Sequence, residues 1–270
     1  MNNGILLRDN RAVKSNKTIQ DTRMAMTPQQ FNLLTCLIGK IKPQDDPYTL
    51  YEISVQEFCE ATGKQLGNGY YYTSIKEDLQ ALADKSTYIL MDDGREHLFR
   101  WLDEVIIDRG NGTVEVSFHR DARKFLFALT RNFTTYPVGH LLALKTMAAK
   151  RLYEILCSYK NMKKRSISLD ALKRELNADG YTAYYDFRRY VLDKSIKEIN
   201  EYTDLTVSYA AKSRKGSKKV EFIEFTIGEV GLMEADVREM NRRIAFEYNH
   251  DHEKWEEDIW GRGKSDDIVK

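Results

Sequence analysis

The sequence is poor in the residues that mark several large classes of protein. It has only 3 cysteines in 270 residues, Cys36, Cys59 and Cys157, and no C-x-x-C pair. This scarcity argues against a disulfide framework or a cysteine zinc site, and it favours buried free thiols in a reducing cytosol. No run of about 18 apolar residues is present, and the start has no signal-peptide pattern. We therefore expect a cytoplasmic protein that does not engage a membrane.

Motifs of nucleotide-binding and acyl-transfer enzymes are also missing. No Walker loop, G-x-S-x-G elbow or glycine-rich dinucleotide fingerprint occurs. In "NHDHEKW", His250 and His252 could act as metal ligands, as does the His-hydrophobe-His pair of rolling-circle replication nucleases. Here the middle residue is Asp251 and the neighbours are charged, so a solvated tail is the better interpretation. We expect no enzyme activity, no cofactor and no metal, with a nicking nuclease as a weak alternative.

The composition is that of a globular protein whose charge is unevenly spread. The chain is 42% apolar and 31% charged, with a net charge of only +1. From residue 159 to 220, however, 15 Lys and Arg stand against 8 Asp and Glu, a local +7. From residue 229 to 270, 7 stand against 12, a local −5. A basic module followed by an acidic tail can hide a nucleic-acid-binding surface within a neutral total.

Periodicity and capping residues predict the same order of elements twice. After a polar, basic arm, Thr27 and Pro28 begin a helix that Pro43 ends, and Ser54 with Glu57 forms a capping box after a short strand. A third helix, with Ile75, Leu79 and Leu82 on one face, and a hairpin turning at 110–112 complete the series. After Pro137 the helix, short strand, two helices and hairpin recur, at a spacing of about 110 residues.

Helix, strand, two helices and a β-hairpin form the plan of the winged helix-turn-helix, whose third helix enters the major groove of DNA. We therefore predict an α+β fold, mainly α, made of two tandem winged helix-turn-helix domains. The expected boundaries are 1–24 for the arm, 25–135 and 136–228 for the two domains, and 229–270 for an acidic tail, mostly helical or flexible.

Specific motifs carry a resemblance to a known family. "FTTY" at 133–136, "RLYEIL" at 151–156 and "FRRYVLDKSIKEIN" at 187–200 resemble the plasmid replication initiator (Rep) proteins with two winged-helix domains. The match is strongest over 131–227 and weaker upstream. The resemblance implies that the protein binds repeated sequences at a replication origin and promotes origin opening. It also implies dimerisation through the first domain, monomers that bind origin repeats, dimers that act as repressors or couplers, and host helicase or initiator proteins as partners.

The predicted third helix of the second domain, 183–202, is the candidate base-reading element. Wound at 100° per residue, it places Phe187, Val191 and Ile199 on one side, with Arg188 toward that apolar side. The candidate DNA-binding residues of this helix are Tyr185, Arg188, Arg189, Tyr190, Lys194 and Lys197. Arg189 is the firmest of them, because arginine grips guanine O6 and N7 with two parallel hydrogen bonds. An ordinary solvated helix face is the alternative.

Two further cationic clusters are candidates for phosphate contacts. The predicted hairpin turn carries Lys212, Arg214, Lys215, Lys218 and Lys219 around Gly216. Such a wing can lie along phosphates, although a solubilising hairpin tip is the alternative. The loop "YKNMKKRS" offers Lys163, Lys164 and Arg165, either to flanking phosphates or simply to solvent. In the first domain the corresponding helix has few cations, Lys64 and Lys76, and three consecutive tyrosines, which favours weaker DNA contact, a protein interface, or both.

Taken together, the residues favour a sequence-specific double-stranded DNA-binding protein over an enzyme. A plasmid replication initiator is the main hypothesis, and repression of its own synthesis is a further expectation. A tandem winged-helix transcriptional regulator with no role in initiation is the alternative.

Overall fold

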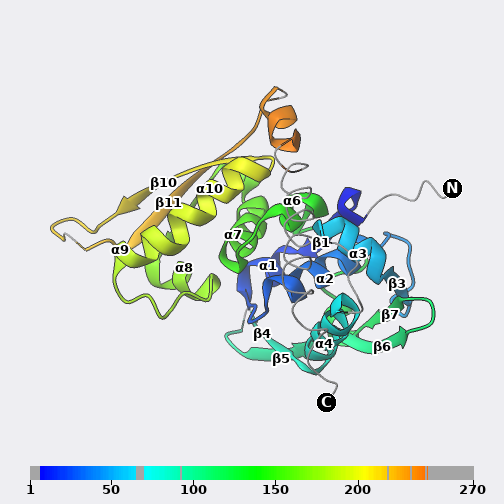
Figure 1. The fold of residues 1–270 in the computed structure, drawn as a ribbon. Coiled ribbons are helices and arrows are strands. Elements are labelled where there is room, and N and C mark those ends of the chain that lie inside the picture. Colours follow the sequence, from blue (N-terminus) through cyan, green and yellow to red (C-terminus); the bar gives the residue numbers. More distant parts are fainter. Residues whose placement is uncertain are drawn as a thin grey trace, which may run out of the picture.

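The computed structural model describes residues 7–64, 70–91, 93–217, 219–231, 233–240 and 242, and its two winged halves lie beside each other (Figure 1). The first described residues do not form an arm. They fold as a 3-10 turn η1 (Leu7–Asp9), β1 (Arg11–Ser15), α1 (Asn16–Asp21) and β2 (Thr22–Arg23). The expected arm is therefore wrong for residues 7–23, because Ala12, Lys14 and Ile19 are fully buried.

The first winged helix follows the predicted order. It consists of α2 (Pro28–Gly39), β3 (Tyr51–Ser54), α3 (Val55–Thr62), α4 (Tyr70–Asp84) and the hairpin of β6 (Leu102–Asp108) and β7 (Thr113–Phe118). Both expected helix starts are confirmed, since Thr27 with Gln30 and Ser54 with Glu57 form capping boxes. These reciprocal hydrogen bonds satisfy backbone N–H groups that a helix start leaves free.

An additional hairpin separates α4 from the first wing. β4 (Ser86–Leu90) pairs with β5 (Glu96–Arg100), and β2 adds to the other edge of β4 to give a sheet in the order β2-β4-β5. The sequence predicts β4 but not the start of β5. The second half has no counterpart of this hairpin between its third helix and its wing.

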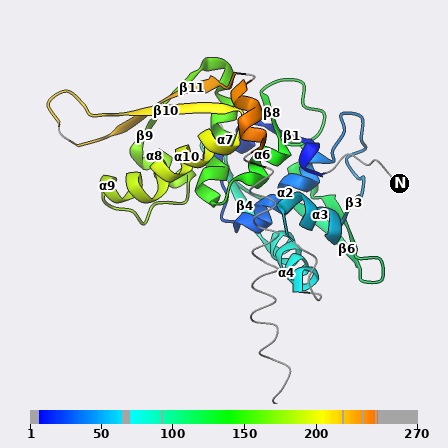
Figure 2. The same ribbon diagram turned by 45° about the horizontal axis from the view of Figure 1, so that its top comes forward.

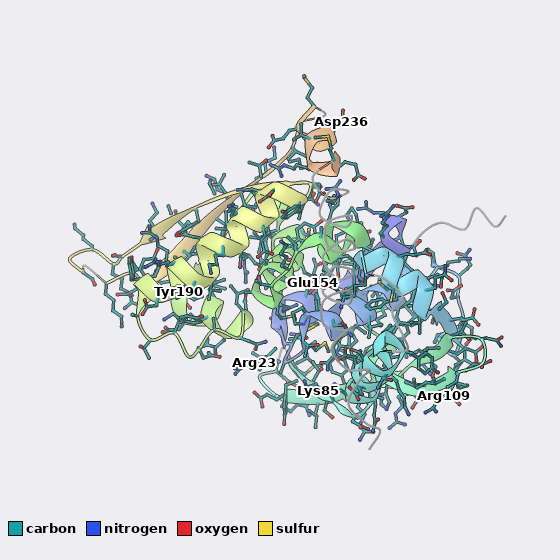
Figure 3. The ribbon with its side chains drawn as sticks, viewed as in Figure 1. Arg23, Lys85, Arg109, Glu154, Tyr190 and Asp236 are labelled. Carbon is teal, nitrogen blue, oxygen red and sulfur yellow. The ribbon has the colours of Figure 1, made fainter. Side chains whose placement is uncertain are left out.

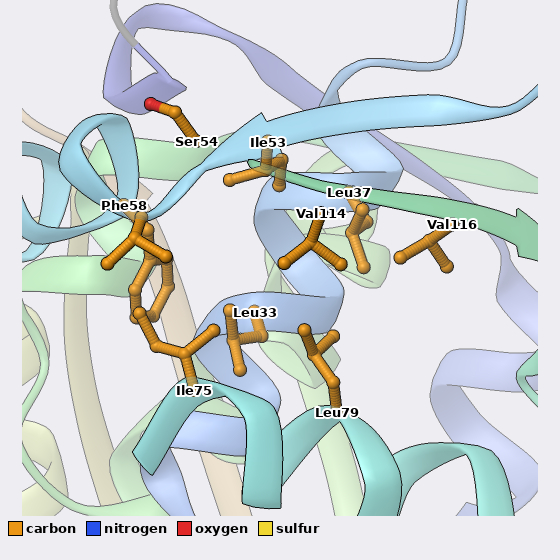
Figure 4. A pocket seen from close by; sticks show the side chains of 10 residues that line it. Leu33, Leu37, Ile53, Ser54, Phe58, Ile75, Leu79, Val114 and Val116 are labelled. Carbon is orange, nitrogen blue, oxygen red and sulfur yellow. The ribbon is translucent and has the colours of Figure 1, made fainter. Parts of the chain in front are cut away.

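The core of the first half is an apolar cluster between its helices and its wing (Figure 4). Leu33 and Leu37 of α2 meet Ile75 and Leu79 of α4 and Val114 of β7 around a small space without charged lining residues. Ile75 and Leu79 belong to the apolar face that helical periodicity predicts for the third helix. The cluster holds the first winged helix together, and the one polar side chain that lines the space, Ser54, already caps α3 through its hydroxyl.

Between the halves run β8 (Phe133–Pro137), the short α6 (Val138–Ala143) and α7 (Met147–Ser158), followed by the 3-10 turn η2 (Lys160–Met162). The predicted helix with Leu152, Ile155 and Leu156 on one side is confirmed as α7, and these three side chains are fully buried. β8 pairs antiparallel with β1, so that Arg11 lies opposite Pro137. The chain thus returns to its first strand before the second half begins.

A buried charged network fastens the first strand to α7. Glu154 Oε1 accepts hydrogen bonds from Lys14 Nζ at 2.7 Å and from Tyr136 OH at 2.6 Å. Arg151 Nη1 donates to Glu154 Oε2 at 2.6 Å, and its Nη2 donates to Ile19 O and Thr22 O. Burial alone raises the pKa of Glu154, but the charges of Lys14 and Arg151 outweigh it and lower the pKa, so the carboxylate stays ionised.

The second winged helix repeats the plan of the first, and α7 precedes β9 as α2 precedes β3. It comprises β9 (Lys164–Ser168), α8 (Leu169–Glu175), α9 (Tyr184–Phe187), a π-helical turn η3 (Arg188–Leu192), α10 (Asp193–Tyr202), β10 (Leu205–Lys212) and β11 (Phe222–Glu229). Its sheet has the order β10-β11-β9, and that of the first half the order β3-β7-β6. In both, the short strand pairs with the second strand of the wing. The predicted tandem repeat is confirmed.

Past the second wing, residues 233–240 form a helix that packs against the end of α10. It lies at the top of the view in Figure 1, where it is drawn in orange. Among the described residues, no helix is long and apolar enough to cross a membrane. All 3 cysteines are buried free thiols, as the sequence predicts.

Candidate nucleic-acid interface

The candidate reading helix is continuous from residue 184 to 202 but is not a regular α-helix. Its central turn is π-helical, and the N–H of Asp193 donates to Arg188 O, five residues earlier. Such a turn holds one more residue than an α-helical turn, so the helical phase changes across it. Phe187, just before the turn, and Val191 and Leu192, at its end, remain buried. The side chains between them are turned outward.

This change of phase corrects the expected place of Arg188. A regular helix turns Arg188 toward the apolar side, whereas in the structure its side chain is 51% exposed. Its Nε donates to Asp193 Oδ2 at 3.2 Å, and Asp193 Oδ1 accepts from Tyr209 OH of β10 at 2.6 Å. Asp193 therefore joins the reading helix to the wing. Sequence reasoning missed this positioning role, because a spacing of five residues is no signal in a regular helix.

The outward face of the helix combines aromatic rings with cations. Tyr185 is 62% and Tyr190 is 46% exposed. The Arg189 guanidinium lies 5.4 Å and Lys194 Nζ lies 5.7 Å from the centre of the Tyr190 ring. Lys197 is exposed on the following turn. The structure thus brings Arg189, Tyr190 and Lys194 together, and these contacts hold the two cations without neutralising them.

The wing extends from the same end of the molecule as α9 (Figures 1 and 2). At its tip, Gly216 has a φ of 84°, a conformation that favours glycine and allows the tight turn. Lys212 pairs with Glu224 at 3.5 Å, and Arg214 pairs with Glu221 at 2.7 Å. Lys215 and Lys219 are exposed at the turn, and Lys218 lies outside the described residues.

The cluster at 163–165 divides between surface and core. Lys163 and Lys164 are exposed, and Lys164 lies opposite Thr226 of β11, along the sheet from the wing tip. Arg165 is only 8% exposed, and its Nη2 donates to both carboxylate oxygens of Glu175, at 2.7 and 2.9 Å. Its guanidinium also packs over the Tyr159 ring. Arg165 therefore holds β9 to α8, and the idea that it contacts flanking phosphates does not fit this geometry.

The start of the reading helix is held by a buried lysine. Ala183 provides no side-chain cap for α9. Instead, Lys173 of α8, 7% exposed, donates from Nζ to Thr182 O at 3.3 Å and to Tyr181 O. These bonds fix the turn between the second and third helices of the winged helix. Lys173 therefore has a structural role, whereas the lysines of the wing are exposed to solvent.

The corresponding surfaces of the first half differ in charge. α4 carries a single lysine, Lys76, against Glu77, Asp78 and Asp84. The first wing, 102–118, has 4 acidic residues and 1 arginine, a net −3, whereas the second wing, 205–229, has 5 cations and 3 acidic residues, a net +2. The two wings extend toward opposite sides of the molecule (Figures 1 and 2). Only the second half presents a wing attractive to phosphates.

The joint between the halves is polar. Asp204, which follows α10, accepts hydrogen bonds from Tyr153 OH at 2.8 Å and from Lys160 Nζ at 3.2 Å. Its Oδ1 also lies 3.1 Å from His140 Nδ1 of α6. Burial alone raises the pKa of Asp204, but these partners, His140 first among them, lower it well below its usual range. The carboxylate therefore ties α6 and α7 to the second half while ionised.

Within the described ranges, no cluster of three or more His, Cys, Asp or Glu side chains could hold a metal ion. His250 and His252 lie outside these ranges. Their proposed role as ligands of a nicking enzyme is therefore not tested by the geometry.

Family models match most of the chain. The model described as initiator replication protein, WH1, matches residues 11–157, and that described as initiator Rep protein, WH2, matches 168–227. The chain belongs to the initiator Rep protein family. The first match begins with β1 and ends at residue 157, and the second begins at residue 168, whereas the sequence suggests a boundary at 135 and 136. The helix at 233–240 lies beyond both.

Curated relatives of this Rep protein are distant. The PI protein of Escherichia coli is 31% identical over 138 residues, which are 44% of this chain and 45% of the relative. An uncharacterized 27.6 kDa protein of Escherichia coli is 26% identical over 120 residues, 41% of this chain and 47% of the relative. The chain thus spans about half the length of the curated relatives it matches.

A solved structure shares the fold over a longer stretch. It is that of the Pi initiator protein in complex with iteron DNA, with a TM-score of 0.70 and 19% identity. The similarity covers 83% of this chain and 98% of the other. At this identity the match shows that this Rep protein has the same two-domain fold.

Proposed function

We propose that this Rep protein initiates plasmid replication. It binds repeated sequences at the origin as a sequence-specific double-stranded DNA-binding protein, and it then promotes opening of the origin. The observation that carries the proposal is the exposed face of Arg189, Tyr190 and Lys194 at the same end of the molecule as the cationic wing. The solved structure of the Pi initiator protein, which has a similar fold and is in complex with iteron DNA, supports the proposal.

Some residues of this surface can contact base edges, and others can contact phosphates. Arg189 stands in the π-helical turn near the start of the helix, where a recognition helix reaches base edges, and its guanidinium can bind a guanine bidentately. Lys215 and Lys219 of the wing, with Lys194 and Lys197 of α10, can neutralise phosphates and release counterions. Phosphate contacts position the protein on the duplex, and base contacts select the site.

Partners beyond DNA belong to the same proposal. We propose that the molecule acts in the cytoplasm, that it is not an enzyme, and that monomers and dimers exchange through the first half, whose wing is acidic. Host helicase or initiator proteins are further partners in this proposal. A tandem winged-helix regulator without a role in initiation is the second candidate, because the same surface would serve repression.

The test is footprinting of the purified full-length protein on its own plasmid's origin DNA, followed by permanganate probing for unpaired thymines. We expect protection of several repeats and, with the host proteins added, reactive thymines in an adjacent A·T-rich segment. Arg189→Ala is the matched control and should shift the protection to higher protein concentrations. Protection without strand opening would favour the regulator. Cleavage of one strand with a covalent protein–DNA link would favour the nuclease.

A further inference from the structure

Asp193 is an acidic residue among the cations of the reading helix. It begins α10, directly after the π-helical turn, and its side chain is 44% exposed. Arg189 and Lys194 stand on the same stretch of helix. A carboxylate weakens the attraction of such a surface for phosphates. The contacts of Asp193 within the protein show what this carboxylate does there instead.

The contact between Asp193 and Arg188 depends on the π-helical turn. The N–H of Asp193 donates to Arg188 O, and Arg188 Nε donates to Asp193 Oδ2 at 3.2 Å. In a regular α-helix, side chains five residues apart point about 140° away from each other. The extra residue of the turn brings these two side chains to one side. The same turn carries Tyr190, which lies in Figure 3 at the end of the molecule from which the wing extends.

The other carboxylate oxygen of Asp193 is held by the wing. Tyr209 of β10 donates from its hydroxyl to Asp193 Oδ1 at 2.6 Å. The Tyr209 ring packs against Phe225 of β11, with 6.4 Å between the ring centres, and this contact fixes the place of the hydroxyl. Burial and the hydrogen bond to Asp193 raise the pKa of Tyr209, so this phenol keeps its proton and remains a donor. Asp193 is therefore fixed by the helix and by the wing at the same time.

The bond to Asp193 leaves most of the Arg188 guanidinium available. Only Nε is engaged, and neither Nη1 nor Nη2 has a hydrogen-bond partner among the residues that the structure describes. An arginine binds guanine O6 and N7 through two parallel N–H groups, and the two Nη nitrogens can supply such a pair. An ion pair as exposed as this one adds little to stability. Its effect is to orient the guanidinium before DNA arrives, which lowers the conformational entropy lost on binding.

We propose that Arg188 reads one guanine of the repeat, and that Asp193 and Tyr209 are the positioning residues that orient its guanidinium toward that base. The inference rests on the proposed function for the repeat itself. It adds a second reader beside Arg189, whose guanidinium is placed over the Tyr190 ring. The two arginines read different bases, and only the base that Arg188 reads depends on a contact with the wing.

The experiment measures the affinity of the full-length protein for duplexes with one repeat, in which each guanine is replaced in turn by 7-deazaguanine. This base pairs with cytosine as guanine does but lacks the N7 acceptor. With the wild-type protein, we expect the affinity to fall roughly tenfold at each guanine that an arginine binds. Arg188→Ala should abolish the fall at one guanine, and Arg189→Ala should abolish it at a different one.

The positioning variants are Tyr209→Phe and Asp193→Asn. Tyr209→Phe keeps the ring that packs against Phe225 and removes only the hydroxyl. In both variants we expect the fall at the guanine of Arg188 to shrink to about threefold, while the fall at the guanine of Arg189 stays roughly tenfold. A merely structural role would reduce both falls alike, because a displaced helix moves both arginines.

Asp186→Asn is the matched control for the charge of Asp193. Asp186 is an exposed carboxylate of α9 and has no hydrogen bond or ion pair with the residues that the structure describes. Removing either carboxylate should strengthen binding to random DNA by a similar factor, since one less negative charge faces the phosphates. Only Asp193→Asn should also weaken the discrimination at the guanine of Arg188.

Two results would overturn the inference while leaving the proposed function intact. Equal dependence on N7 in Arg188→Ala and in the wild-type protein, at every guanine, would mean that Arg188 is not a reader. Full dependence on N7 in both positioning variants, or an equal reduction at both guanines, would mean that Asp193 and Tyr209 do not orient Arg188. The proposed function fails separately, and the inference with it, if the wild-type protein binds the repeat no more tightly than random DNA.

Discussion

The two winged halves share one plan and differ in the charge of their surfaces. In each, a serine caps the second helix, Ser54 in α3 and Ser168 in α8, and the short strand before it pairs with the second strand of the wing. The first wing nevertheless has a net charge of −3 and the second +2. The plan decides where a wing lies, and the charge decides whether it can lie on DNA.

The halves also differ in what holds them together. The first is fastened by a buried charged network around Glu154, which joins β1, β8 and α7. The second is a smaller apolar core whose ion pairs, such as Arg165 with Glu175, lie nearer the surface. Removing one charge should therefore harm the first half more than the second, and the predictions below test this difference and the difference in DNA contact.

The largest effect is expected from Glu154→Gln. Both Lys14 and Glu154 have fully buried side chains, so the variant leaves Lys14 and Arg151 charged without a counter-ion. We expect the free energy of unfolding of the first half to fall by about 3–5 kcal/mol. Urea unfolding followed by the fluorescence of the buried Trp101, with Trp255 and Trp260 replaced by Phe, measures it.

The control for this variant is Asp21→Asn, which removes the partly exposed pair of Asp21 with Lys17 on α1. Its cost should be at most about 1 kcal/mol, as for other surface ion pairs. Equal losses in the two variants would mean that the buried network does not set the stability of the first half.

A smaller effect is expected in DNA binding from Arg189→Ala. Loss of one base-reading contact should weaken binding to the cognate repeat by about 1–3 kcal/mol and affect random DNA much less. Lys76→Ala in α4 is the counterpart in the first half and should change cognate binding less. Titration by fluorescence anisotropy on both DNAs measures the four affinities. Equal losses on cognate and random DNA would reassign Arg189 to backbone contact.

The smallest effect is expected from the wings. Lys215→Ala with Lys219→Ala should lower the slope of log affinity against log salt by about one to two units, on cognate and random DNA alike. Asp103→Asn with Glu104→Gln in the first wing should leave the slope unchanged. Affinities at several salt concentrations provide both slopes. A reduced slope in the first-wing variant alone would reverse the assignment of the DNA-holding wing.

Local signals predicted much of this fold. Capping boxes at Thr27 and Ser54, the apolar stripe of α7 and the repeated order of elements depend on residues close in the chain. The role of residues 7–23 could not be predicted in this way. Lys14 gives the sequence of β1 a polar pattern that does not predict burial, and its partner Glu154 lies 140 residues further along the chain.

The candidate site was predicted in part for the same reason. The outward places of Arg189, Tyr190 and Lys194 follow from helical periodicity. Arg188 and Arg165 were misplaced: the π-helical turn changes the phase at Arg188, and Glu175 draws Arg165 inward from a neighbouring helix. Such a turn and such a partner depend on packing across elements, which periodicity within one segment does not contain.

The pairing of β1 with β8 has a consequence for synthesis on the ribosome. Arg11 lies opposite Pro137, and the carboxylate that neutralises Lys14 belongs to residue 154. The first half therefore cannot reach its final state until α7 has left the exit tunnel, although its own winged helix ends at Phe118. Contacts so distant in sequence slow folding, because a long loop must close before they form. Until then, β1 lacks its partner strand β8.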